Sequence, residues 1–158
     1  MNYILCRKKQ TTWHTKLIWT IQDFAALQRK GSFICSPDFY SRDQGYKLNL
    51  LVYPNGDGRS EGSHLSIYVA VAKGEFDAIL PWPFSKTVKI SLLNQKQGEK
   101  NHLMKLVVFN GAESQHNQKP INERNKRFGR KQFISHKELT DSPYLVDDTI
   151  FLEAKVIE

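Results

Sequence analysis

The sequence lacks most features of secreted and membrane proteins. Only two of its 158 residues are cysteines, Cys6 and Cys35, which is too few for a disulfide framework. No apolar run approaches the roughly 20 residues of a membrane-spanning helix, and no Asn-X-Ser/Thr glycosylation acceptor occurs. Between Met1 and Gln10 a short apolar stretch precedes the basic residues, the reverse of a secretory signal. We therefore expect a cytoplasmic protein in a reducing compartment, without membrane insertion.

Residue clusters that carry chemistry are also missing. The histidines show no metal-ligand spacing with one another or with the cysteines; they are His14, His64, His102, His116 and His136. The glycine-containing stretch 55–58 lacks the lysine and the following helix of a phosphate-binding loop. Cys35 lies in an apolar strand-like run, so we interpret it as a small buried hydrophobe, although the sequence leaves a Cys–His nucleophile pair open. The sequence predicts no cofactor, no metal and no catalytic residue in this chain.

Acidic residues are scarce in one segment, although the formal net charge of the whole chain is only +7. Between Ser114 and Lys137 the only acid is Glu123. The cations of this segment are Lys119, Arg124, Lys126, Arg127, Arg130, Lys131 and Lys137. Such a segment attracts anions. Three interpretations stay open: a solvated basic loop, a site for an acidic peptide, or a nucleic-acid surface.

Alternating apolar residues dominate the rest of the chain and predict strands. The alternation is found in residues 16–22, 46–53, 64–72, 88–92, 106–109 and 150–156. In the second run, Tyr46, Leu48, Leu50 and Val52 share one face, and Lys47, Asn49, Leu51 and Tyr53 share the other. Many short strands in a chain of this length indicate one antiparallel β-sandwich domain. We expect Trp19 and Trp82 to be largely buried.

Turn and helix signals separate the runs. Residues 55–58, Asn-Gly-Asp-Gly, predict a turn between two strands, and Pro-Trp-Pro at 81–83 predicts a loop. One short helix is predicted over 23–30, where a glycine follows. A second is predicted from Ser135, because Glu138 stands three residues later as in a capping box.

From Trp19 to Val156 the chain carries a series of short motifs in a fixed order. They are Trp19-Thr20-Ile21 with Asp23-Phe24, Ser36 to Tyr40, Gly45 to Leu48, Tyr53 to Gly58, His64 to Ser66, Gly74 to Ala78, Leu80 to Phe84, Leu92 to Gln95, and Val146 to Phe151. This succession resembles the C-terminal MATH domain of TNF-receptor-associated factors (TRAFs). Residues 103–130 match poorly. The resemblance assigns residues 16–158 to a TRAF/MATH domain and residues 1–15 to an N-terminal extension.

The resemblance implies an eight-stranded antiparallel β-sandwich with one or two short helices. It also implies a non-enzymatic adaptor domain that recognises short peptide segments of receptor tails or signalling adaptors. In such proteins a coiled coil that precedes the domain makes a homotrimer, and a RING-type ubiquitin-ligase module can lie further away. The alternative is the substrate-recognition MATH domain of a ubiquitin-pathway enzyme. A nucleic-acid-binding domain is disfavoured because only the positive charge supports it.

Candidate peptide-binding residues lie on the outward face of two predicted strands. Leu51, Tyr53 and Tyr68 make this face more apolar than solvent alone would favour. Such residues either form an interaction surface or lie under other side chains, and the resemblance favours the interaction. Asp57 and Gly58 first make the turn, and the resemblance implies that they also contact the peptide.

A second set of candidates follows the poorly matching segment. Phe128 and Gly129 resemble a Phe-Gly element of some TRAFs, where the aromatic ring helps to form the peptide pocket. A core anchor beneath the basic segment explains Phe128 nearly as well. TRAF-type domains commonly hold an acidic peptide residue with an arginine at the position of Leu51. We hypothesise that Arg130, together with Lys131, takes over that role if it flanks the same groove.

Overall fold

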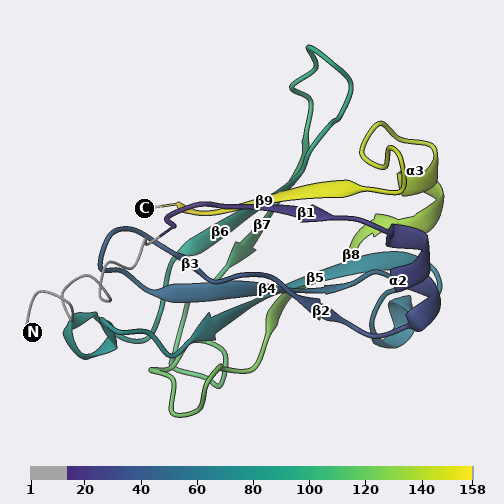
Figure 1. Cartoon of the computed structure of the whole chain (residues 1–158). Helices are drawn as coiled ribbons and strands as arrows, with labels where there is room; N and C mark the ends of the chain where they lie inside the picture. The colour runs from purple at the N-terminus through teal and green to yellow at the C-terminus, as the bar shows by residue number, and fades with distance from the viewer. Residues whose placement is uncertain (1–13, 158) are drawn as a thin grey trace, which may run out of the picture.

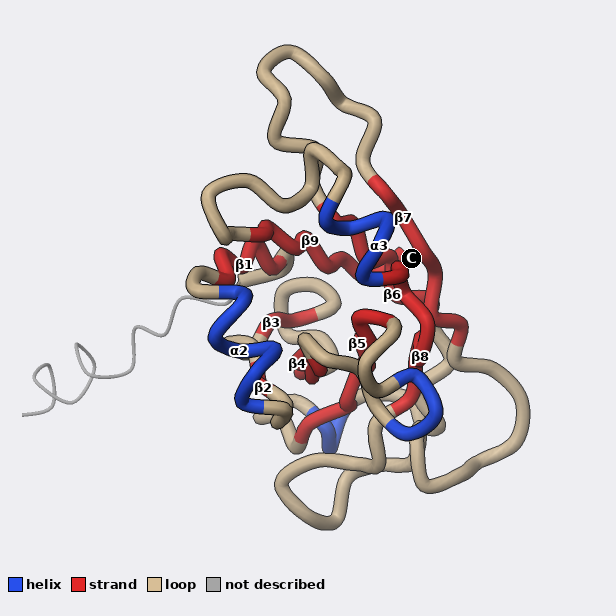
Figure 2. The backbone as a smooth tube through the Cα atoms, turned by 90° about the vertical axis from the view of Figure 1, so that its right-hand side faces the viewer, coloured by secondary structure: helices blue, strands red, loops and turns tan. Residues whose placement is uncertain are grey.

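The computed structural model describes residues 14–157. The predicted N-terminal extension, residues 1–15, therefore lies outside the described residues except for its last two positions. Within the described part the chain forms two stacked β-sheets, with two α-helices at one end of the stack (Figure 1). Viewed from that end, the two layers of strands enclose the interior (Figure 2).

All strand pairs of the two sheets are antiparallel. Sheet A has the order β1 (Leu17–Ile21), β9 (Ile150–Ile157), β6 (Thr87–Leu92) and β7 (Leu103–Val108). Sheet B contains β2 (Ile34–Cys35), β3 (Phe39–Tyr40), β4 (Lys47–Tyr53), β5 (His64–Ala72) and β8 (Phe128–Ser135). The order of sheet B is β2, β4, β5 and β8, and β3 also pairs with β4. Because the two-residue strands β2 and β3 both pair with β4, they act as one interrupted edge strand. The antiparallel sandwich that the sequence predicts is confirmed.

The core lies between the sheets and is built from alternate residues of each strand. Sheet B contributes the predicted apolar face of β4 together with every second residue of β5. Fully buried examples are Leu48, Leu50, Val52, Leu65, Ile67 and Val69. Sheet A contributes Val88, Ile90, Leu92, Ile150, Leu152 and Ala154. Period-two alternation had assigned these residues to one face, and their burial confirms it.

Both predicted helices are present. Helix α2 (Phe24–Lys30) ends at Gly31, whose φ of 73° allows its N–H to reach the carbonyls of the last turn. Helix α3 (His136–Thr140) begins after Ser135, whose Oγ accepts a 3.1 Å hydrogen bond from the Glu138 backbone N–H. In the part of the chain that the structure describes, neither helix approaches the length of a bilayer-crossing helix.

The structure changes one open interpretation of the sequence and corrects two predictions. The basic segment is not one loop, because its second half forms edge strand β8. Trp19 and Trp82 are only half-buried and pack against the rim of the core, although they were expected to be largely buried. Cys35 is exposed, because β2 is a two-residue edge strand and the thiol lies on the face away from the core. The prediction of a small buried hydrophobe at Cys35 is therefore wrong.

Candidate functional site

One face of sheet B points away from the core, and this outer face carries the candidate residues of β4 and β5. Leu51 lies opposite Tyr68 in the antiparallel register, and Tyr68 lies opposite Gly129 of β8. The three residues form one row across the sheet, where side chains of neighbouring strands interact. Leu51 and Tyr68 are each only 7% exposed. The outer face is therefore apolar but partly covered by other side chains. It has features of both alternatives from the sequence, an interaction surface and a covered face.

Two tyrosines on this face form an aromatic pair beneath a cation. The ring centroids of Tyr53 and Tyr68 are 5.6 Å apart in an edge-to-face arrangement. The guanidinium carbon of Arg127 lies 4.6 Å from the Tyr68 centroid and 5.2 Å from the Tyr53 centroid. Both distances are typical of cation–π interactions. Phe33 adds an exposed ring 5.4 Å from Tyr53 and extends the apolar surface towards β2.

Asp57 anchors the cation and one of the tyrosines. The carboxylate accepts a hydrogen bond of 2.8 Å from the Tyr68 hydroxyl and an ion-paired contact of 2.6 Å from Arg127. The backbone N–H of Asp57 donates to Ser66 Oγ over 3.0 Å, which fixes the turn to β5. Gly58, at φ +57°, allows the chain to turn away directly after the carboxylate. We call the resulting set, Leu51, Tyr53, Asp57, Tyr68 and Arg127, the aromatic cluster.

The contacts in the aromatic cluster shift the protonation equilibria of its members. Burial alone would raise the pKa of Asp57, but hydrogen bonds from Arg127 and Tyr68 outweigh it and hold that pKa below its ordinary value. Burial and the neighbouring Asp57 carboxylate raise the pKa of Tyr68 to about 12. Burial also raises the pKa of Tyr53. At neutral pH the cluster therefore holds one carboxylate, one guanidinium and two neutral phenols.

Gly129 brings the backbone of β8 close to the aromatic cluster. A Cβ atom at this position would lie 2.7 Å from the carbonyl oxygen of Ile67 and 2.9 Å from Cα of Tyr68. No real side chain tolerates such distances, so only glycine fits here without a shift of the backbone. Among residues 14–157, β8 is the last strand on this side of sheet B. The edge of the sheet thus lies directly beside the tyrosines.

Phe128 and Arg130 do not join the aromatic cluster. They lie opposite Val69 and Ile67, whose side chains are in the core, so their side chains point to the other face of β8. Arg130 Nε donates a 3.0 Å hydrogen bond to the Leu106 carbonyl on β7. The hypothesis that Arg130 replaces the family's arginine required it to share a groove with Leu51. Arg130 lies on the other face, so this condition is not met.

Phe128 and Arg130 instead line a groove between the edge strands of the two sheets. We call this the β7–β8 groove; its lining residues are Leu106, Val107, Val108, Phe128, Gly129 and Arg130. Phe128 is 39% exposed, and its ring lies 5.2 Å from that of Phe109 and 5.1 Å from that of His116. One part of the Phe128 ring thus packs against Phe109 and His116, and the other part is exposed to solvent.

The structure therefore divides the predicted site residues into two groups. Leu51, Tyr53, Asp57 and Tyr68 come together, and Gly58 and Gly129 shape the backbone around them. Sequence reasoning missed Arg127 and Phe33. Arg127 could not be singled out among seven cations, because its contact with Asp57 spans 70 positions of the chain. Within residues 14–157, no three His, Cys, Asp or Glu side chains gather as metal ligands would.

The sequence matches one family over nearly its whole length. The family model described as MATH domain matches residues 16–156. The chain belongs to the MATH domain family. TNF receptor-associated factor 5 of Mus musculus is 38% identical to this MATH domain over 148 residues, which is 89% of the chain and 26% of that protein. TNF receptor-associated factor 2 of Homo sapiens is 37% identical over 153 residues, 92% of the chain and 27% of that protein.

A solved structure agrees with this assignment. TRAF5 of Notothenia coriiceps superposes on the MATH domain with a TM-score of 0.85 and 34% sequence identity, covering 99% of this chain and 80% of that chain. The chain is thus a MATH domain of the TRAF type, which confirms the resemblance. It spans about a quarter of the length of the curated relatives it matches. The assignment is consistent with a non-catalytic domain that interacts with other proteins.

Proposed function

We propose that this domain binds short extended peptide segments of other proteins, and that the aromatic cluster is the centre of the binding site. The observation that carries the proposal is the pair Tyr53 and Tyr68, held by the Arg127–Asp57 ion pair directly beside an edge strand. Rigid aromatic anchors of this kind supply much of the binding energy of protein interfaces. The names of the relatives associate them with TNF receptors. Receptor tails and signalling adaptors are therefore the first partners to test.

The peptide backbone has a place to bind along β8. Edge strands leave one row of N–H and C=O groups available, and an extended peptide can add to that row as a further strand. Gly129 keeps this edge free of a side chain beside Tyr68. Backbone hydrogen bonds along β8 would supply affinity, and the side chains of the aromatic cluster would supply selectivity.

The chemistry of the cluster favours a peptide that is both acidic and apolar. Leu51 and the exposed ring of Phe33 add apolar side chains beside Tyr53. Arg127 is already paired with Asp57. Lys131 adds a second cation near the Asp57 carboxylate. Its ammonium lies close to Gly58, where an added Cβ atom would be 3.2 Å from it. An acidic peptide residue beside Arg127 and Lys131 would balance this excess positive charge.

The nucleic-acid interpretation fits this geometry less well. Proteins that bind single strands stack bases on open aromatic faces. Here the guanidinium of Arg127 covers both tyrosine rings, and Tyr68 is only 7% exposed. A steep fall of affinity with rising salt would be the mark of nucleic-acid binding.

A peptide-library screen of the purified domain, read position by position, tests the proposal. The selected peptide is then titrated by calorimetry into the parent protein, into Tyr53→Ala and into Phe151→Ala. Phe151 is a matched control because it is also a half-buried aromatic on a strand, but on sheet A. We expect single-site binding in the micromolar range, and a loss of about 2 kcal/mol for Tyr53→Ala but not for Phe151→Ala. Equal losses in the two variants would move the site away from the cluster.

A further inference from the structure

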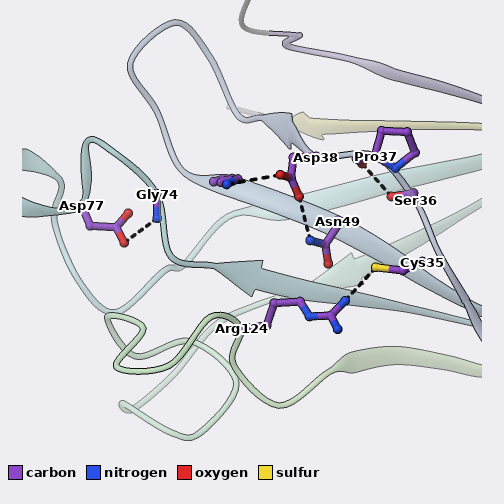
Figure 3. Close-up of polar contacts among 9 residues, drawn as sticks. Cys35, Ser36, Pro37, Asp38, Asn49, Gly74, Asp77 and Arg124 are labelled. Atoms are coloured by element: carbon purple, nitrogen blue, oxygen red, sulfur yellow. Dashed lines mark hydrogen bonds and ion pairs between the residues drawn. The ribbon is translucent and has the colours of Figure 1, made fainter. Parts of the chain in front are cut away.

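Next to the aromatic cluster, on the outer face of sheet B, lies a polar pocket of about 240 Å³ around Cys35. It is lined by strands β2, β4 and β5 and by the segment that leads into β8. The side chains that matter below are Cys35, Asp38, Lys47, Asn49, Lys73 and Arg124. Figure 3 shows how Cys35, Asn49 and Arg124 converge from three different parts of the chain. The sequence left a nucleophilic role for Cys35 open, but it indicated no ligand in this region.

The thiol of Cys35 is exposed and lies against a guanidinium. Arg124 Nη1 is 2.7 Å from Cys35 Sγ, and Arg124 is itself positioned by an isolated β-bridge to Ala72 at the end of β5. The thiolate is the reacting form of cysteine. Cys35 thus combines access from solvent with a cation at its reactive atom.

Asn49 supplies an independent sign that the pocket takes a ligand. The residue is only 5% exposed, and its Nδ2 donates a 2.9 Å hydrogen bond to Asp38 Oδ1, which fixes the orientation of the amide. The amide oxygen, Oδ1, is buried and has no hydrogen-bond partner among residues 14–157. Buried acceptors are normally satisfied, so an unsatisfied one in a pocket wall indicates a missing N–H or O–H donor.

The charges of the pocket favour an anionic ligand. Three cationic side chains line it, those of Lys47, Lys73 and Arg124, against the two acids Asp38 and Glu123. Asp38 is already engaged by Lys47 at 3.2 Å and by Asn49. The ligand that fits is therefore a small molecule with carboxylates, with N–H donors, and with a sulfur that can reach Cys35.

We propose that Cys35 is a site of reversible mixed-disulfide formation with a small anionic peptide thiol of the glutathione type. The carboxylates of the adduct pair with Arg124 and Lys73, and one of its N–H groups donates to Asn49 Oδ1. The thiolate of Cys35 attacks one sulfur of the oxidised, disulfide form of that thiol. The new S–S bond forms as the old one breaks, and the departing thiolate leaves with the bonding electron pair and takes a proton from water. A second molecule of thiol reverses the reaction.

The position of Cys35 would link this modification to the proposed peptide site. Cys35 lies opposite Leu51 in the register of β2 and β4, so the two side chains share the outer face. An adduct on Cys35 would extend beside Leu51 and lower peptide affinity. This consequence rests on the proposed peptide-binding function, whereas the formation of the adduct does not.

Disulfide exchange kinetics test the proposal on a Cys6→Ser background, in which Cys35 is the single thiol of the chain. Adduct formation is followed by intact mass with three probes: anionic glutathione disulfide, neutral 2-hydroxyethyl disulfide and cationic cystamine. Rates are normalised to those of the same chain unfolded in urea. We expect the folded protein to favour glutathione disulfide over the neutral probe, and the neutral probe over cystamine.

Two substitutions separate a built site from an ordinary exposed thiol. Arg124→Met should lower the normalised rate with glutathione disulfide about two- to fivefold, the scale of one exposed ion pair. Lys126→Met removes the same charge from the same segment without touching the pocket, and should change little. Asn49→Leu should lower the equilibrium constant of the glutathione adduct about fivefold, the scale of one hydrogen bond. Thermal unfolding followed by circular dichroism checks that each variant is folded.

The proposal is overturned if the folded protein shows no preference for the anionic probe. It is also overturned if Arg124→Met and Lys126→Met react alike. These measurements need no peptide, so they stand even if the peptide site lies elsewhere. Conversely, a clear anionic preference with unchanged peptide affinity of the adduct would retain the modification site and remove only its link to Leu51.

Discussion

The aromatic cluster and the β7–β8 groove meet at two consecutive residues of the chain, yet they differ in how their cations are held. Arg127 belongs to the cluster, and Phe128 belongs to the groove. In the cluster, the cation is paired with Asp57 and covers two rings. In the groove, Arg130 donates to a backbone carbonyl of the opposite sheet. Arg127 is thus held by the Asp57 carboxylate and two tyrosine rings, whereas Arg130 bridges the two sheets.

Only one of the two surfaces is pre-organised for recognition. Tyr68 is held by its hydroxyl, by its ring and by its row partner Leu51, so its orientation is fixed before any ligand arrives. Fixed side chains lose little entropy on binding. Phe128 has one exposed half and ring contacts only on the other half. We therefore expect the cluster to anchor a peptide and the groove to contribute secondary contacts.

The largest effect is expected from truncating the buried ring of the cluster. Tyr68→Ala should lower the free energy of unfolding by about 3 kcal/mol, because it removes a nearly buried aromatic side chain and the hydrogen bond to Asp57. Phe128→Ala in the groove should cost only about 1 kcal/mol, since that ring is 39% exposed. Urea denaturation measures both values. A larger loss for Phe128→Ala would reverse the comparison.

A smaller effect is expected from removing the two arginines in turn. Arg127→Met should lower the free energy of unfolding by about 1.5 kcal/mol, because it leaves the Asp57 carboxylate without its charged partner. Arg130→Met should cost less than about 0.5 kcal/mol, because it removes one exposed hydrogen bond to a carbonyl. The two variants carry the same change in charge, so each controls for the other in the same denaturation series. Indistinguishable values would mean that Asp57 does not depend on Arg127.

Placing a cation in the row beside Tyr68 should change peptide preference by a further, smaller amount. Leu51→Arg is expected to increase affinity for acidic peptides by about 1 kcal/mol, because one exposed ion pair is worth up to that value. The long side chain can keep its stem on the apolar surface and its charge in water. Calorimetry with a matched pair of peptides, one with Glu and one with Gln at the selected position, measures the preference. Leu51→Lys introduces the same charge without the planar guanidinium of arginine. If neither variant favours the Glu peptide, the ligand does not approach Leu51.

The smallest effect at neutral pH comes from the phenol of Tyr68. Its pKa of about 12 lies above the ordinary value near 10, so the neutral form is favoured in the folded protein. The associated stability is fully present below pH 10 and is lost as the pH rises towards 12. Tyr68→Phe should therefore reduce the fall of the free energy of unfolding across this interval. Absorbance titration of tyrosinate should show that the late-titrating phenol disappears in Tyr68→Phe. If the phenol that disappears in Tyr68→Phe titrates near pH 10 instead, the contact with Asp57 is contradicted.

The predictable part of this structure is the part governed by local alternation. The outward parity of Leu51, Tyr53 and Tyr68 followed from period-two patterning, because each strand exposes alternate residues to opposite faces. Strand β8 was not predicted, since Gly129 and the basic residues after it have low strand propensity and are held by pairing with β5. The contact of Arg127 with Asp57 depends on that pairing, which no local pattern encodes.

For the candidate site, local features could be predicted from the sequence, but contacts between distant elements could not. The turn at Asp57 could be read from its glycines, but the two hydrogen bonds that its carboxylate accepts come from distant elements. Cys35 was misjudged because an apolar run predicts a strand without saying that the strand is a two-residue edge. The side on which Arg130 lies is set by the register of β8, and this register also separates it from Leu51.

Mapping the bound peptide by NMR tests the central claim most directly. The library-selected peptide is titrated into the isotopically labelled domain, and amide shifts are followed for all assigned residues. We predict the largest shifts at Tyr53, Asp57, Tyr68 and Gly129, with smaller shifts at Phe128. Shifts concentrated on the exposed face of β1 and β9, with the aromatic cluster unchanged, would contradict it.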